Sequence, residues 1–146
     1  METKKILRLL IAEDDEDDRL LITKAFQKCI PKENITCVGD GEELIQYLNK
    51  TSLAENCIFP IPDIILLDLN MPKKDGRTTL QVIKSHEEFR KIPVIIFTTS
   101  NLKEDILITY TLGASSFISK PSTFGELVKV TKEIESYWSN TVLLPT

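Results

Sequence analysis

The sequence predicts a doubly wound α/β fold, in which a five-stranded parallel sheet is covered by helices on both faces. Short apolar segments alternate five times with segments of helical periodicity, an arrangement typical of parallel sheets. Two of these segments, 64–67 and 94–97, are apolar throughout, as expected for strands buried on both faces. The length of 146 residues favours a single domain over 1–146, with a core at 5–136 and a C-terminal extension at 137–146.

The first half of the chain supplies two strands and two helices. Residues 7–12 are mostly apolar and predict a strand, after which apolar residues recur at helical spacing as far as Pro31. That helical face consists of Leu21, Ala25, Phe26 and Cys29. Residues 35–38 predict the second strand. A second helix follows Asp40-Gly41, and its apolar face consists of Leu44, Ile45 and Leu48.

A polar connection over 49–62 leads to the third strand at 64–67. The next loop contains Pro72 and Gly76, and the helix after it has Leu80 and Ile83 on its apolar face.

The last part of the chain supplies the fourth and fifth strands, at 94–97 and 116–119, and a helix between them that ends at Gly113. Glycine is favoured there because it adopts the left-handed conformation that closes a helix. Thr123-Phe124-Gly125-Glu126 matches a capping box and predicts the start of a final helix. Its apolar side consists of Leu127, Val130, Ile134, Tyr137 and Trp138.

Composition excludes several functional classes. The net charge of −4 argues against binding to the nucleic-acid backbone, and no apolar run has the length of a membrane span. The N-terminus has no signal-peptide pattern, so we expect a cytoplasmic protein. The cysteines, Cys29, Cys37 and Cys57, show neither a disulfide framework nor the spacing of a zinc site.

Polar residues stand where the predicted strands end. Glu13-Asp14 follow the first strand, Asp68 the third, Thr98 the fourth and Lys120-Pro121 the fifth. Ligands of such folds bind at the carboxyl ends of the strands, where the strand order reverses. With the strand order 2-1-3-4-5, the first and third strands are neighbours, so the three carboxylates converge.

Converging carboxylates repel one another unless a cation lies between them, and Mg²⁺ suits such an oxygen-rich site. Lys120 adds a positive charge and Thr98 a hydroxyl donor. Acids, a divalent metal, a lysine and a hydroxyl are together typical of phosphoryl transfer. Asp68 is then the nucleophile that forms an acyl phosphate. The acidic residues Asp17 and Asp18 are interpreted instead as a solvated helix start.

The sequence resembles the receiver domains of two-component response regulators over nearly its whole length. The resemblance rests on Asp68-Leu69-Asn70-Met71-Pro72 with Asp75-Gly76, on Glu13-Asp14, on Thr98, on Gly113-Ala114 and on Lys120-Pro121. It implies the flavodoxin-like receiver fold and a signalling module rather than an enzyme, with Asp68 accepting a phosphoryl group from a histidine kinase.

The resemblance also implies a role for each site residue. Mg²⁺ would be bound by Asp14, Asp68 and the carbonyl of Asn70, with Glu13 helping through water. Lys120 would hold the phosphoryl oxygens and precede a cis bond to Pro121. Thr98 and Phe117 would form the switch that responds to phosphorylation, although Phe117 is equally consistent with a plain core residue.

Within that family, the chain is similar to the stand-alone receivers that serve cyanobacterial phytochrome kinases. The similarity rests on 70–77, on the long connection at 49–62 and on the C-terminal Tyr137 to Pro145. It implies output through protein contacts, with no direct nucleic-acid or membrane partner. It also implies a homodimer through the helix before Gly113, the strand at 116–119 and the last helix. The apolar C-terminus could instead fold back on its own domain.

Two alternative functions remain. A haloacid-dehalogenase-like phosphatase uses a similar set of groups, but its nucleophile follows the first strand, and Asn70 stands where its general acid would be. A protein-interaction module without phosphorylation is disfavoured because every acceptor-site residue is present.

Overall fold

The computed structural model describes residues 6–51 and 59–145. Its five strands form one parallel sheet in the order β2-β1-β3-β4-β5. They are β1 (Leu9–Ala12), β2 (Ile35–Val38), β3 (Ile64–Leu67), β4 (Val94–Thr98) and β5 (Ser116–Ser119). This confirms the predicted fold class and strand order. Cys57 and most of the predicted connection at 49–62 lie outside the described residues.

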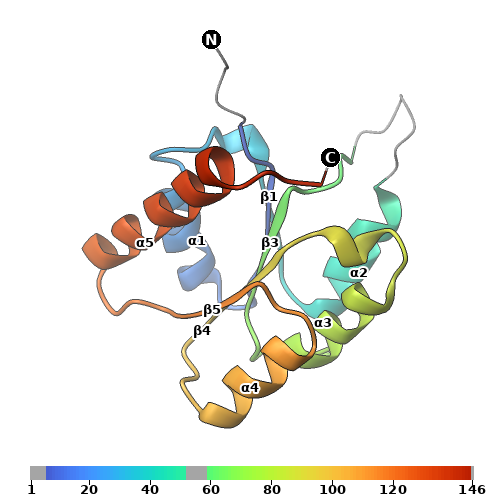
Figure 1. Ribbon diagram of the computed structural model, residues 1–146. Helices are drawn as coiled ribbons and strands as arrows, with labels where there is room; N and C mark the ends of the chain where they lie inside the picture. Colours follow the sequence, from blue (N-terminus) through green and yellow to red (C-terminus); the bar gives the residue numbers. More distant parts are fainter. Residues whose placement is uncertain (1–5, 52–58, 146) are drawn as a thin grey trace.

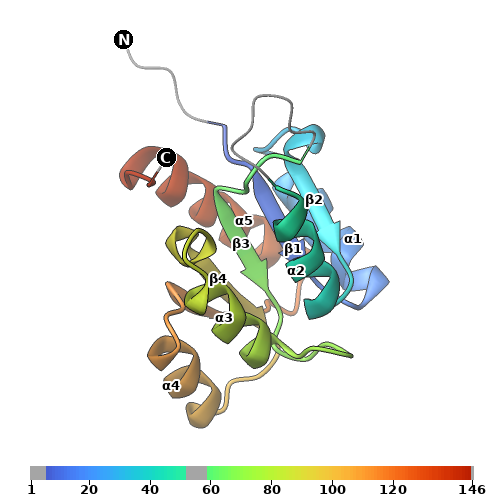
Figure 2. The same ribbon diagram turned by 90° about the vertical axis from the view of Figure 1, so that its right-hand side faces the viewer.

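Five helices cover the sheet in two layers (Figures 1 and 2). One layer contains α1 (Glu16–Phe26) and α5 (Phe124–Ser136), which contact each other. The other contains α2 (Gly41–Lys50), α3 (Gly76–Ser85) and α4 (Lys103–Thr111), with α3 touching both neighbours. Short helical turns occur at Lys32–Asn34, Phe89–Lys91 and Tyr137–Thr141.

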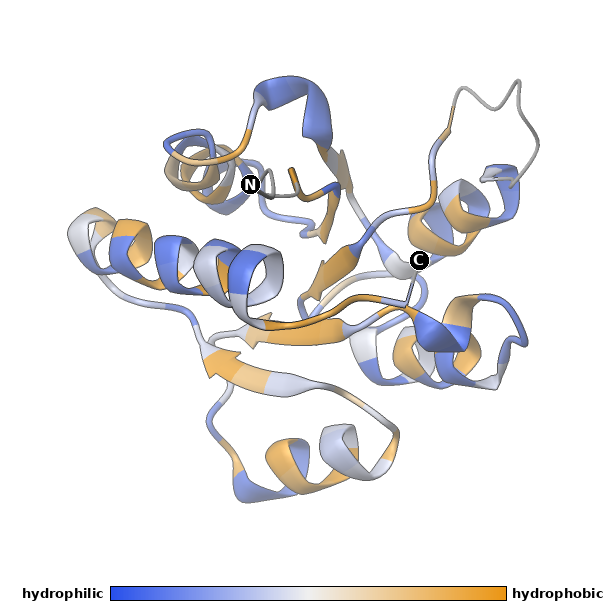
Figure 3. Cartoon of the chain, turned by 45° about the horizontal axis from the view of Figure 1, so that its top comes forward, coloured by the Kyte–Doolittle hydropathy of each residue, from blue (hydrophilic) through white to orange (hydrophobic). Residues whose placement is uncertain are grey.

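Alternate residues of each strand face opposite layers, so the core has two halves. Leu10 and Ile65 pack with the side of the sheet covered by α2 and α3, whereas Ile11 and Leu66 pack with the side covered by α1 and α5. The three interior strands β1, β3 and β4 are buried throughout, and in Figure 3 the strands are largely hydrophobic. Burial on both faces explains their uninterrupted apolar runs.

The predicted helix ends are confirmed at two positions. The Thr123 hydroxyl accepts a hydrogen bond from the backbone N–H of Glu126 at 3.2 Å and caps α5. Gly113 has a φ of 107°, so the chain after α4 turns through a conformation that favours glycine.

Two expectations about packing need correction. Leu21 is 43% exposed, and Ile22 instead joins Ala25 and Phe26 on the buried side of α1. Leu21 and Ile22 both have helical spacing to Ala25, at four and three residues, so that spacing alone does not separate them. The first strand is also shorter than predicted, because β2 and β3 pair only with Leu9 to Ala12.

The C-terminal segment folds back onto its own domain. Trp138 and Leu144 pack against the core half that contains α1 and α5, while Leu143 is 96% exposed. The Ser139 hydroxyl donates to the Glu135 carboxylate at 2.6 Å, which ties the segment to the end of α5. In the described ranges, no helix is long and apolar enough to cross a lipid bilayer.

Candidate functional site

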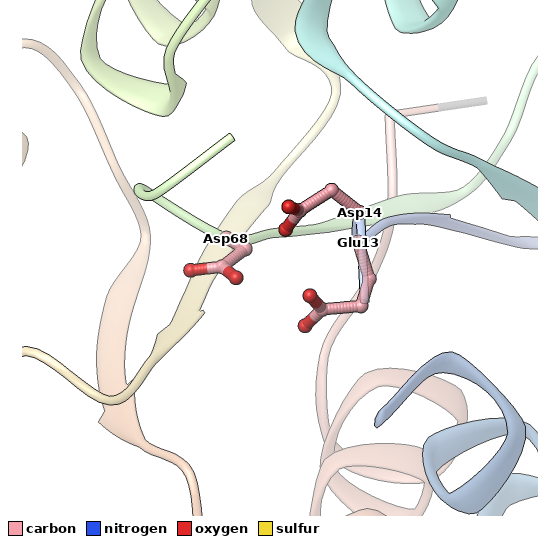
Figure 4. A group of neighbouring side chains, drawn as sticks. All are labelled: Glu13, Asp14 and Asp68. Atoms are coloured by element: carbon pink, nitrogen blue, oxygen red, sulfur yellow. The ribbon is translucent and has the colours of Figure 1, made fainter. Parts of the chain in front are cut away.

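Three carboxylates meet at the carboxyl ends of β1 and β3, as the sequence predicts. One oxygen each from Glu13, Asp14 and Asp68 can be chosen so that all three lie within 4.8 Å of one another. Figure 4 shows Asp68 on one side of a common space and the two consecutive acids on the other. Asp68 and Glu13 are buried, whereas Asp14 is exposed.

The sheet fixes the backbone of this site beyond the ends of the strands. The N–H of Asp68 donates to the Ala12 carbonyl at 3.1 Å, and the N–H of Glu13 donates to the Val38 carbonyl at 3.0 Å. The N–H of Lys120 donates to the Thr98 carbonyl at 2.8 Å. These bonds continue the parallel ladders by one step, so side chains from three strand ends have defined positions.

Close packing holds the loop after Asp68. The Asp68 carboxylate accepts a hydrogen bond from the N–H of Asn70 at 3.2 Å, and the N–H of Gly76 donates to the Leu69 carbonyl at 2.9 Å. A Cβ on Gly76 would overlap the carbonyl of Asp68, so the start of α3 can approach the loop only because residue 76 has no side chain. Gly76 is therefore needed for the position of Asp68.

Lys120 is the cation of the site. Its Nζ donates to Asp68 at 3.1 Å, to Asp18 at 3.2 Å and to Glu13. Burial lowers the pKa of Lys120, but the hydrogen bond to Glu13 and the charges of Asp68 and Glu13 outweigh burial and raise it overall. Lys120 therefore carries its positive charge at neutral pH.

Glu13 has a pKa raised to about 7. The largest cause is burial, which opposes ionisation, and the charge of Asp68 acts in the same direction. The hydrogen bond from Lys120 opposes these effects but does not cancel them. In the absence of another cation, the site thus holds more carboxylate than a single lysine can neutralise.

The donor set fits a small divalent cation such as Mg²⁺. Mg²⁺ takes oxygen ligands at about 2.1 Å, which places opposite ligands about 4.2 Å apart. Carboxylate oxygens within 4.8 Å of one another need only small adjustments to share such an ion. The exposed Asp14 leaves room for the waters that Mg²⁺ retains.

The remaining predicted residues surround this centre. Thr98 is fully buried at the end of β4, and its hydroxyl accepts a long hydrogen bond of 3.5 Å from the N–H of Ser100. Asn70 is exposed beside Asp68. Phe117, on β5, is half-buried against the core half with α2 and α3, and its N–H donates to the Tyr110 hydroxyl at 3.2 Å.

The expected cis peptide bond before Pro121 is wrong. The bond between Lys120 and Pro121 is trans, and no peptide bond between described residues is cis. Trans is the more stable state of an X–Pro bond by about 0.5–1 kcal/mol, and the resemblance alone led to the opposite expectation.

Two features of the site region were missed. Asp18 was interpreted as part of a solvated helix start, yet its side chain bonds Lys120. Asp105, in α4, accepts hydrogen bonds from Arg77 of α3 at 2.6 Å and from the Ser100 hydroxyl at 2.6 Å. No pattern in the sequence singles out Asp18 for the first, because three consecutive acids occupy the first turn of α1.

Comparisons with known proteins agree with this geometry. Residues 9–132 match the family described as the response regulator receiver domain. The chain is 34% identical over 137 residues to response regulator Rcp1 of Synechocystis sp., an alignment that covers 94% of this chain and 92% of Rcp1.

Two solved structures are also similar. The phosphorylated cyanobacterial phytochrome response regulator RcpA superposes with a TM-score of 0.86 at 35% identity, covering 97% of this chain and 100% of RcpA. The Mn²⁺-bound form of Rcp1 superposes with a TM-score of 0.80 at 33% identity, covering 94% and 98%. The family match and the level of identity establish that this chain belongs to the response regulator receiver domains, the signalling modules of two-component systems.

Proposed function

We propose that this receiver accepts a phosphoryl group on Asp68 from a histidine kinase, with Mg²⁺ bound by Asp14, Asp68 and the Asn70 carbonyl and with Glu13 acting through water. The observation that carries the proposal is the cluster of Glu13, Asp14 and Asp68 at the switch point of the sheet, with Lys120 bonded to two of these carboxylates, Glu13 and Asp68. The relation to a phosphorylated and to a Mn²⁺-bound homologue supports it.

The chemistry follows from the positions of these groups. An Asp68 oxygen attacks the phosphorus of a phosphohistidine, a P–O bond forms, the P–N bond breaks, and the histidine nitrogen leaves with the bonding electron pair. Mg²⁺, when bound, offsets the negative charge that gathers on the phosphoryl oxygens. Lys120 stabilises the same charge, because its Nζ already lies 3.1 Å from Asp68. Thr98 supplies a hydroxyl at the neighbouring strand end.

Output is proposed to pass through protein contacts on the α4–β5–α5 face, which would form a homodimer. Thr98 and Phe117 would connect the phosphoryl group to this face. The kinase is proposed to be phytochrome-like, because RcpA is a phytochrome response regulator. The protein is proposed to work in the cytoplasm as a single receiver domain, with no nucleic-acid or membrane partner and no catalysis beyond its own phosphorylation and dephosphorylation.

Incubation with acetyl phosphate and Mg²⁺, followed by intact mass spectrometry, tests the phosphorylation. We expect one phosphoryl adduct that is labile to acid and base, does not form when EDTA is present in place of Mg²⁺, and is absent in Asp68→Asn. Asp17→Asn, which changes an exposed acid on α1, should form the adduct as the wild type does. Steady hydrolysis of phosphate esters would favour a phosphatase instead, and no adduct in the wild type would favour a plain interaction module.

A further inference from the structure

Every N–H donor of the Lys120 ammonium is engaged. A lysine has three such donors, and the structure gives Lys120 three carboxylate partners, namely Glu13, Asp18 and Asp68. A phosphoryl group on Asp68 brings new oxygens that also need donors. Lys120 can therefore bind a phosphoryl oxygen only by withdrawing a donor from one of its present partners.

The three partners differ in how easily they can be released. The side chains of Glu13 and Asp68 are 2% and 7% exposed, so loss of the Lys120 hydrogen bond would leave one buried oxygen, Oε1 of Glu13 or Oδ2 of Asp68, without this donor. The Asp18 side chain is 43% exposed, and water can replace Lys120 there at little cost. Asp18 is thus the partner that Lys120 gives up first.

The surroundings of Asp18 allow this release. Its backbone N–H is fixed at 2.9 Å by the Asp15 carboxylate, which caps α1, so the helix does not depend on the side chain of Asp18. Asp18 and Lys120 also line the same cavity, of about 140 Å³, between α1 and the start of α5. The carboxylate therefore has space in which to rotate away from Lys120.

We propose that Asp18 is a positioning residue that competes with the phosphoryl group for Lys120. In the unphosphorylated protein Asp18 retains one donor of Lys120, and phosphorylation of Asp68 transfers that donor to a phosphoryl oxygen. Asp18 thereby lowers the affinity of the site for a phosphoryl group. This inference rests on the phosphorylation of Asp68 proposed above.

Binding of beryllofluoride, an analogue of the phosphoryl group, tests the inference. The full chain is titrated in Mg²⁺ and followed by isothermal titration calorimetry and by the ¹⁹F NMR signal of the bound ion. For Asp18→Ala we expect an apparent Kd about two- to fivefold lower than that of the wild type, since partly exposed ion pairs contribute up to about 1 kcal/mol. Asp18→Asn should lie between them, because its amide oxygen still accepts a hydrogen bond but carries no charge.

Asp17→Ala is the matched control, since it removes the same charge from an exposed neighbour of Asp18 on the first turn of α1. Equal tightening in Asp17→Ala and Asp18→Ala would show a general charge effect and overturn the inference, as would weaker binding in Asp18→Ala. Should Asp18→Ala not fold, by circular dichroism, Asp18→Asn and Asp17→Asn form the deciding pair. Absence of binding in the wild type would instead overturn the phosphorylation proposal and this inference with it.

Discussion

At the scale of single residues, the site is defined by an excess of carboxylates over cations. Lys120 neutralises part of this charge, and the pKa of Glu13 remains near 7 because burial outweighs the lysine. An ordinary Glu has a pKa of 4.5. The folded protein therefore binds a proton at Glu13 more tightly than the unfolded chain does, and this difference links the stability of the site to pH.

We predict that Glu13→Gln increases the stability of the metal-free protein over that of the wild type, and that this increase is larger at pH 8 than at pH 5. The stabilising contribution of Glu13 is fully present below its unfolded pKa of 4.5 and is lost as the pH rises through about 7. Gln does not ionise, so its contribution does not change with pH. Between pH 5 and pH 8 the free energy of unfolding of the variant, relative to that of the wild type, should therefore rise by on the order of 2 kcal/mol. Urea unfolding in EDTA at both pH values measures this gain.

Glu16→Gln, in the exposed first turn of α1, is the control for the loss of an acid. Added Mg²⁺ should raise the stability of the wild type at pH 8 more than that of Glu13→Gln, because the metal offsets the charge of Glu13. If the free energies of unfolding of Glu13→Gln and wild type differ by the same amount at both pH values, the prediction is wrong.

The sequence predicted the residues of the site better than their contacts. Glu13, Asp14 and Asp68 converge as expected, because parallel strands bring their carboxyl ends to one edge of the sheet. The Asp18 contact was missed, because acids in the first turn of a helix already have an explanation in the helix dipole. Which of several adjacent acids meets a distant lysine depends on the packing of α1 against α5.

At the scale of elements, α4 differs from the other helices because its two buried residues are both polar. Asp105 and Thr109 face inward, whereas Leu107 and Ile108 are 70% and 45% exposed. Helical periodicity indicated that a helix ends near Gly113 but did not show which side faces the sheet. The reason is that the inward side of α4 is held by hydrogen bonds rather than by apolar burial.

We predict that Arg77→Met weakens the attachment of α4. Arg77 donates twice to Asp105, and hydrogen bonds from Ser100 and Arg77 lower the pKa of Asp105. Loss of the arginine should lower the free energy of unfolding by roughly 1–2 kcal/mol at pH 7. The lowered pKa of Asp105 contributes stability above its usual value of 3.8, and this contribution is lost as the pH falls further. The effect of Arg77→Met should therefore shrink at pH 3.

Urea unfolding of wild type and Arg77→Met at pH 7 and pH 3 measures the loss in free energy of unfolding at each pH. Arg90→Met, at an exposed arginine beyond α3, is the control. An equal loss of stability at the two pH values would mean that Arg77 acts through packing of its stem and not through Asp105.

At the scale of the whole molecule, the α4–β5–α5 face combines an edge strand with an apolar helix surface. β5 is at the end of the sheet, and the Tyr110 hydroxyl accepts from its Phe117 N–H. α4 packs beside β5, and it is the lowest helix in Figure 3, where part of its ribbon has the hydrophobic colour. The exposed apolar residues of α4 and their neighbour before the helix are Leu102, Leu107, Ile108 and Tyr110.

The C-terminal segment was a second candidate for the partner surface, but Trp138 and Leu144 are used within the domain. Truncation after Ser136 would remove both residues from the core and destabilise the fold, so a change in association would have two explanations. A single exposed residue on α4 gives a cleaner test of the proposed homodimer. Leu107 is suitable because 70% of its side chain is exposed.

We predict that Leu107→Glu weakens the proposed homodimer more than tenfold. A glutamate at the centre of an apolar interface loses its hydration without gaining a partner, whereas in the monomer it stays in water. Sedimentation equilibrium of wild type and variant, with and without beryllofluoride, measures the dissociation constants. Leu20→Glu, at a leucine of α1 that is 54% exposed on the other layer, should leave association unchanged. Equal weakening by both variants, or by neither, would exclude the α4–β5–α5 face as the dimer interface.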